Sequence, residues 1–179
     1  DAANGDYTLT SALAMSCKVG AKKWNPSYAA GDDTCFTVTS ADEFQSAIDA
    51  GKTDIKFAMS GSPYDLSAEN ITIAASMHVN GEVVNGEYPV IKIKQIDLLP
   101  GVETLVFENL AVEGDGANNI FNVKEAIAAK QIVIRNNIIS KAGKSVFYDN
   151  VGGAATSIVI RNNIIKELVE GIVNVFNKT

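Results

Sequence analysis

One carboxylate and two guanidinium groups stand at the same position of three similar segments in this sequence. Glu108 lies in LVFENLAV, whereas Arg135 and Arg161 lie in two copies of IVIRNNII. A carboxylate can act as a general base, and an arginine can neutralise an anionic group of a substrate. These three residues are therefore the candidates for catalysis, provided that the fold brings the three segments side by side.

The spacing of the three segments predicts that the fold does so. They begin at Leu105, Ile132 and Ile158, which gives repeat lengths of 27 and then 26 residues. Each repeat carries at least two short β-rich runs separated by turn residues, and it contains no helical pattern. Such units cannot bury an apolar face alone and must stack on their neighbours. The sequence therefore predicts an all-β fold, a right-handed single-stranded parallel β-helix (solenoid) of about four to five coils, with a β-sandwich as the alternative.

Stacking in register sorts the repeat positions into an inner and an outer face. Equivalent residues of stacked coils lie about 4.8 Å apart, and successive residues of a strand face opposite sides. The inner columns are then Leu105–Ile132–Ile158 and Phe107–Ile134–Ile160, and the outer columns are Val106–Val133–Val159 and Glu108–Arg135–Arg161. We expect Glu108 to pair with Arg135 in a solvated surface ladder, which offsets the repulsion between the two arginines.

Asparagine residues follow the arginines in both copies of the repeat. The pairs are Asn136-Asn137 and Asn162-Asn163, and Asn109 stands at the equivalent position of the first segment. Asparagine tolerates the left-handed geometry of a bend, and stacked amides can hydrogen-bond from coil to coil. We interpret these residues as structural corners. The pattern leaves open which member of each pair points inward.

A short helix is predicted upstream of the repeats. Ser40 and Glu43 form the S-x-x-E pattern of a capping box, and Gly51 stands where a helix end favours left-handed geometry. The helix should span about 41–50. We expect residues 1–35 to form an irregular segment that packs on the coil, and residues 36–179 to form the β-helix domain.

The order of these features resembles the pectate-lyase-like right-handed parallel β-helix superfamily. The stretch FTVTSADEFQSAIDAG resembles its opening strand and capping helix, and MHVNGEVVNGEYPVIKI resembles a coil with an Asn-Gly turn. The resemblance covers residues 36–179 and is greatest to β-helix domains of gut-bacterial surface and secreted proteins. It implies a bacterial protein that is secreted or held at the cell surface and is associated with glycans.

In the lyases of that superfamily, a catalytic arginine acts near acidic residues that bind calcium. Elimination needs a base for the proton beside the uronate carboxylate and a cation that neutralises this carboxylate. The outer column offers Glu108, Arg135 and Arg161, but no grouped set of acidic residues. We therefore expect a non-catalytic module that binds carbohydrate or serves as a scaffold. The alternatives are a polysaccharide lyase or hydrolase acting on acidic glycans, and a structural coil of a surface adhesin.

Acidic and aromatic residues of the turns are the candidates for ligand contacts. They are Glu113, Asp115, Tyr148 and Asp149. Calcium requires six to eight oxygen ligands, which these turns do not assemble, so we expect no cofactor and keep calcium as the alternative. His78 is the only histidine, which gives little support to histidine-based catalysis, and its alternation with its neighbours predicts the outer face of a strand.

Composition restricts the partners. The net charge of −6 and the isoelectric point of about 4.8 argue against nucleic-acid binding. No window approaches the roughly 18 apolar residues of a membrane span. Cys17 and Cys35 are compatible with a disulfide in an exported protein or with two buried thiols.

The last β-rich run, GIVNVFNKT, has no helix or polar cap after it. An open coil end exposes apolar side chains and unpaired strand groups. We therefore expect Ile172, Val173, Val175 and Phe176 to be covered by a second copy of the chain or by further residues. The alternative is that Phe176 and the residues after it fold over the core.

Overall fold

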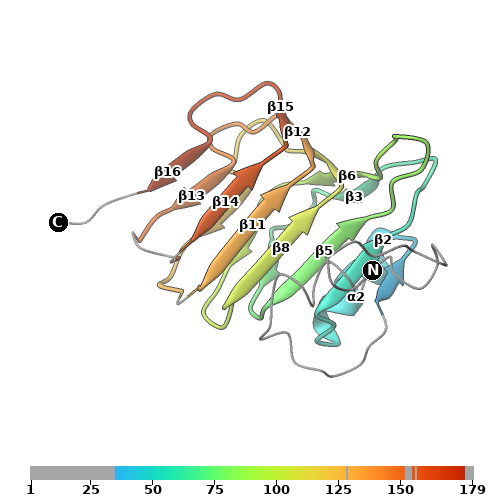
Figure 1. Cartoon of the computed structure of the whole chain (residues 1–179), viewed down its shortest axis with the longest axis horizontal. Coiled ribbons are helices and arrows are strands. Elements are labelled where there is room, and N and C mark those ends of the chain that lie inside the picture. The colour runs from blue at the N-terminus through green and yellow to red at the C-terminus, as the bar shows by residue number, and fades with distance from the viewer. Residues whose placement is uncertain (1–34, 128, 152–154, 156, 176–179) are drawn as a thin grey trace, which may run out of the picture.

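The structure is a computed structural model that describes residues 35–127, 129–151, 155 and 157–175. The chain forms a parallel β-solenoid with three sheets and one short helix (Figure 1). All neighbouring strands in the three sheets run parallel, which confirms the predicted β-helix and excludes the antiparallel sandwich.

Each turn of the coil adds one strand to each sheet. Sheet A has six strands, β1 (Phe36–Val38), β2 (Asp54–Phe57), β5 (Met77–Gly81), β8 (Thr104–Glu108), β11 (Gln131–Arg135) and β14 (Ile158–Arg161). Sheet B has five strands, β3 (Tyr64–Leu66), β6 (Val90–Ile93), β9 (Ala111–Glu113), β12 (Ile138–Ser140) and β15 (Ile164–Ile165). Sheet C also has five, β4 (Ile71–Ile73), β7 (Ile96–Leu98), β10 (Phe121–Val123), β13 (Phe147–Asp149) and β16 (Val173–Val175). The predicted number of coils is confirmed, because four full turns separate β2 from β14 and β14–β16 begin another.

The predicted register of the repeats is confirmed residue by residue. Ile134 pairs with Phe107 on one side and with Ile160 on the other. Phe107 and Ile134 are fully buried in the core, and Ile160 packs against it. The repeat contains three strands, since the residues after the asparagines form the short strands of sheet B.

The predicted helix is present as α2 (Ala41–Asp49). The Ser40 hydroxyl accepts the Glu43 N–H as the capping box requires, but the Glu43 carboxylate accepts from the Thr39 N–H and hydroxyl. Gly51 ends the helix with φ of +71°. The ring of Phe44 lies 4.7 Å from that of Phe57, so α2 closes the N-terminal end of the core.

The chain upstream of β1 was expected to pack on the coil, but residues 1–34 lie outside the described residues, as does Cys17. Cys35, which directly precedes β1, is disulfide-bonded, so the alternative of a buried free thiol at Cys35 is wrong. Among the described residues, no helix is long and apolar enough to cross a membrane.

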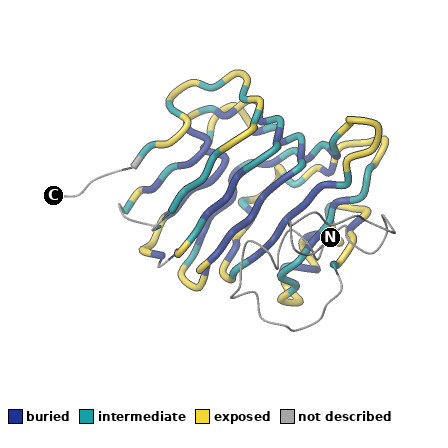
Figure 2. Tube along the Cα trace, in the orientation of Figure 1, coloured by how far each residue is buried: buried dark blue, intermediate teal, exposed yellow. Residues whose placement is uncertain are grey.

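The last coil carries exposed apolar side chains (Figure 2). Ile172 and Val173 are both close to half exposed, and Val169 is largely exposed. Phe176 lies outside the described residues. The identity of whatever covers this coil end stays a prediction.

We expect the Ile134→Asp variant not to fold. A carboxylate at this fully buried position would have no partner, which costs several kcal/mol. The whole stability of a domain is only about 5–15 kcal/mol. Thermal unfolding followed by circular dichroism tests this, with Ile138→Asp on the half-buried outer face of sheet B as the milder control. Wild-type-like melting of Ile134→Asp would show that the core is assigned incorrectly.

Candidate functional site

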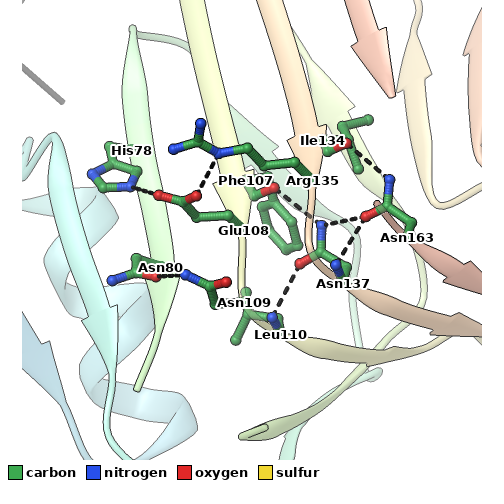
Figure 3. A network of polar contacts seen from close by, with 10 residues as sticks. All are labelled: His78, Asn80, Phe107, Glu108, Asn109, Leu110, Ile134, Arg135, Asn137 and Asn163. Carbon is green, nitrogen blue, oxygen red and sulfur yellow. Dashed lines mark hydrogen bonds and ion pairs between the residues drawn. The ribbon is translucent and has the colours of Figure 1, made fainter. Parts of the chain in front are cut away.

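A network of charged side chains lies on the outer face of sheet A (Figure 3). We call Asp54, His78, Glu108 and Arg135 the sheet A network. The Glu108 carboxylate lies at its centre, with one oxygen 2.9 Å from His78 Nε2 and the other 2.5 Å from Arg135 Nε. Asp54 Oδ1 lies 3.2 Å from His78 Nδ1, within ion-pair distance but without the alignment of a hydrogen bond.

Four neighbouring strands position this network. Asp54 and His78 are directly opposite each other on β2 and β5, and Glu108 and Arg135 are opposite each other on β8 and β11. His78 reaches Glu108 diagonally, since its direct partner on β8 is Val106. The network therefore depends on the outward alternation of residues in each strand.

The expectation that Glu108, Arg135 and Arg161 form a ladder exposed to solvent is partly wrong. Glu108 does pair with Arg135, and Arg161 continues the column on β14. However, Glu108 is only 6% exposed and the Arg135 side chain only 12%, whereas Arg161 is exposed. His78 is 1% exposed, which confirms the outer face of the strand but not access to solvent. The repeat alignment does not reveal the role of His78, for two reasons. His78 precedes the repeated segments in the sequence, and it reaches Glu108 diagonally across the two strands.

His78 and Glu108 are both charged at neutral pH. Burial opposes the charging of His78, but the nearby carboxylates of Asp54 and Glu108 outweigh it and raise the pKa of His78 to about 9. Burial also opposes the ionisation of Glu108, but His78 and Arg135 lower its pKa to about 2. A buried carboxylate with so low a pKa is a poor proton acceptor. The geometry therefore suits a structural ion network better than acid–base catalysis.

The asparagine pairs form the corner between sheets A and B, as predicted. Asn136 and Asn162 have φ of 55° and Asn109 has φ of 60°, so the first position of each corner makes the left-handed bend. The second position points inward, because Asn137 is buried and Asn163 is half-buried.

The inward asparagines join successive coils through an amide ladder (Figure 3). Asn137 Oδ1 accepts the Leu110 N–H at 3.0 Å, and its Nδ2 donates to the Phe107 carbonyl at 3.1 Å. One coil later, Asn163 repeats this pattern with the Asn137 N–H at 2.9 Å and the Ile134 carbonyl at 2.9 Å. These side chains satisfy backbone groups that the bend takes out of the sheets.

The acidic turn residues are engaged within the chain. Glu113 Oε1 lies 2.6 Å from Lys141 Nζ. The Asp115 carboxylate accepts from the N–H groups of Ala117 and Asn118 and from the Asn118 amide, so it holds its own turn. In the part of the chain that the structure describes, no group of three or more His, Cys, Asp or Glu residues could hold a metal ion.

Of the remaining candidates, Tyr148 faces outward and Asp149 faces inward. Asp149 is buried in register with Val123 of the core and accepts the Val151 N–H, so it cannot belong to an exposed site. Tyr148 is half-buried on the outer face of sheet C and pairs with Asn122. It belongs to a polar column, the sheet C column, which consists of Thr72, Asp97, Asn122, Tyr148 and Asn174.

Asp97 anchors the sheet C column. Its carboxylate accepts four side-chain hydrogen bonds of 2.7–3.0 Å, from Gln95, Lys124, Asn70 and Asn122. Burial opposes its ionisation, but these donors together lower the pKa of Asp97. The repeats do not reveal this cluster, because Asn70, Gln95 and Asp97 precede the repeated segments.

In comparisons with known proteins, no family model, no curated protein and no solved structure matches the chain. The fold is therefore stated as a parallel β-solenoid, without assignment to a family.

Stability should decline on both sides of a plateau between about pH 4.5 and 6.5. The Glu108 contribution is present above its ordinary pKa of 4.5 and is lost as the pH falls through the folded value of about 2. The His78 contribution is present below its ordinary pKa of 6.5 and is lost as the pH rises through about 9. Urea unfolding measured from below pH 4.5 to above pH 6.5 gives the free energy of unfolding on both the acidic and the basic side of the plateau. The advantage of wild type over Glu108→Gln should shrink as the pH falls below 4.5, and a constant difference would contradict the assignment.

The Asn137→Ala variant should lose about 2–5 kcal/mol of stability, because the Leu110 N–H and the Phe107 carbonyl each lose a buried partner. Denaturant unfolding measures the loss. Asn150→Ala, at an exposed position, is the matched control and should change stability by about 0.5 kcal/mol or less. Equal losses for the two variants would argue against a corner ladder.

Proposed function

We propose that this chain is a non-catalytic module that binds a glycan along the sheet C column. The observation that supports this most is the outward row of amide, carboxylate and phenol groups on successive coils. Such groups are the usual hydrogen-bonding partners of sugar hydroxyls, and the rows repeat about every 4.8 Å. That spacing is comparable to the length of one sugar residue in an extended chain.

The C-terminal end of the column supports the same proposal, whereas Asp97 and Asn122 within the column are buried. Tyr148 and Asn174 are half-buried, so an aromatic face and an amide remain accessible next to each other. Lys124 holds Asp97 while half of its side chain stays exposed. An aromatic ring can stack on the apolar face of a sugar, and the neighbouring polar groups would orient the hydroxyls.

The sheet A network argues for binding without turnover. Its central carboxylate is buried between two cations and has a pKa of about 2, so it would not take a proton from a uronate. Arg135 is already paired with that carboxylate. A polysaccharide lyase centred on Glu108 and Arg135 is therefore the less supported function.

We further propose that the protein is secreted or held at the cell surface. The disulfide bond at Cys35 supports this location, because structural disulfides persist mainly in oxidising compartments.

The Tyr148→Ala variant tests the proposal. An array of polysaccharide fragments identifies the strongest glycan, and titration calorimetry with that glycan measures the dissociation constant. Loss of ring stacking worth about 1 kcal/mol should weaken binding roughly five-fold. Tyr88→Ala is the matched control, because Tyr88 is also half-buried but lies in the turn before β6 of sheet B.

Other outcomes would favour the alternatives. Release of unsaturated uronate products from polygalacturonate, abolished by Arg135→Ala, would show a lyase. Equal weakening by Tyr148→Ala and Tyr88→Ala would place the glycan elsewhere. If the chain shows neither glycan binding nor turnover, a structural coil would be the favoured function.

A further inference from the structure

The accessible end of the sheet C column presents mainly uncharged polar groups. We use this name for Lys124, Tyr148, Asn150 and Asn174. Tyr148 and Asn174 are half-buried on neighbouring strands, and Asn150, which directly follows β13, is exposed. The Tyr148 hydroxyl donates to Asn150 Oδ1 at 3.3 Å. A phenol and two amides both donate and accept hydrogen bonds, so they suit hydroxyl groups and need no charge on the ligand.

Lys124 carries the positive charge of the accessible end, and this charge is already matched. Its Nζ lies 2.7 Å from Asp97 Oδ2, although half of the lysine side chain is exposed. Among the described residues, Lys124 is the only cation that bonds to a residue of the column. Burial opposes the ionisation of Asp97, but its hydrogen-bond donors lower the pKa of this carboxyl. The ion pair therefore adds no net charge to the face.

A chain of uronic acids would meet an unfavourable arrangement of charges here. Each of its sugar residues carries one carboxylate, and the coils repeat about every 4.8 Å. One ammonium group would therefore face several carboxylates, and it would bind one of them only by leaving Asp97. Asp97 would then lie beside a second anion without its own cation, and like charges repel. The net charge of −6 opposes a polyanion at longer range as well.

We propose that the sheet C column selects neutral glycans over polyuronates, and that the ion pair between Asp97 and Lys124 sets this specificity. The inference rests on the glycan site proposed above and names the class of glycan that it takes. A neutral sugar has a hydroxymethyl group where its uronate has a carboxylate, so it binds with the ion pair intact. Asp97 is thus a positioning residue, which acts on the glycan by holding Lys124.

Titration calorimetry on the full chain with matched oligosaccharides tests the specificity. The probes are oligomers of glucose, mannose and galactose, each paired with the oligomer of the corresponding uronic acid in the same linkage. In the pair that binds, the neutral member should have the lower Kd. The difference should shrink as salt is added, because salt screens the repulsion of the uronate. Binding of the neutral member should hardly depend on salt.

The Asp97→Asn variant tests the role of the ion pair. The amide keeps the shape of the side chain but removes its charge, so that Lys124 becomes free for a uronate. The Kd ratio of uronate to neutral oligomer should fall about five-fold, which is the contribution of one exposed ion pair. Combining Asp97→Asn with Lys124→Gln should restore the wild-type ratio. Damage to the column alone would weaken both oligomers and leave the ratio unchanged.

Glu113→Gln is the matched control. Glu113 pairs with Lys141 on sheet B at 2.6 Å, and the Lys141 side chain is 52% exposed, compared with 51% for Lys124. This variant therefore frees an equivalent lysine and changes the net charge by the same amount, but away from the column. It should leave the Kd ratio unchanged.

The contrary outcomes distinguish this inference from the proposed function. A uronate that binds the wild type as tightly as its neutral partner would overturn the specificity while the glycan site stands. An unchanged ratio in a folded Asp97→Asn variant, or an equal fall in Glu113→Gln, would overturn the role of the ion pair. Binding of neither member of any pair would overturn the proposed function and this inference together. If Asp97→Asn does not fold, Lys124→Gln alone replaces it and should raise the ratio, because Asp97 then keeps an unmatched charge.

Discussion

Parallel hydrogen bonding between equivalent residues of successive coils is the constraint on which the other contacts in this molecule depend. Each strand of the middle coils pairs with the coil before and the coil after it in all three sheets. A side chain that suits its position therefore meets a similar side chain above and below. Apolar columns merge into one core, and polar columns become either ion networks or amide ladders.

The two polar faces use this constraint differently. On sheet A the charges neutralise one another, since the Glu108 carboxylate is shared between His78 and Arg135. On sheet C the donors converge on Asp97 at one end of the column, while Tyr148 and Asn174 remain accessible at the other. A saturated, buried network stabilises the coil, whereas accessible polar groups can exchange their water for a ligand. This difference is why we propose binding on sheet C.

The repeat allowed much of the fold to be predicted, because periodic apolar residues report directly on register. The pairing of Ile134 with Ile160, the asparagine corners and the capping helix all follow from local patterns in the sequence. The contact between His78 and Glu108 could not be predicted in this way, since it is diagonal and involves a coil without the repeated motif. Burial of the outer face of sheet A was also missed. Alternation separates two faces of a strand, but it does not show what lies above either face.

The corner ladder determines where the length of a coil can vary. Every coil-to-coil bond of Asn137 and Asn163 requires the same distance along the chain between strand and bend. The one-residue difference between the 27- and 26-residue repeats instead falls between sheets B and C, where Glu113 and Phe121 are eight residues apart but Ser140 and Phe147 are seven apart. A solenoid of this kind can therefore lengthen only by complete repeats at the corner between sheets A and B. Duplicating one repeat would add a rung to each column without disturbing the rungs already present, whereas a single residue inserted at the corner would break the ladder.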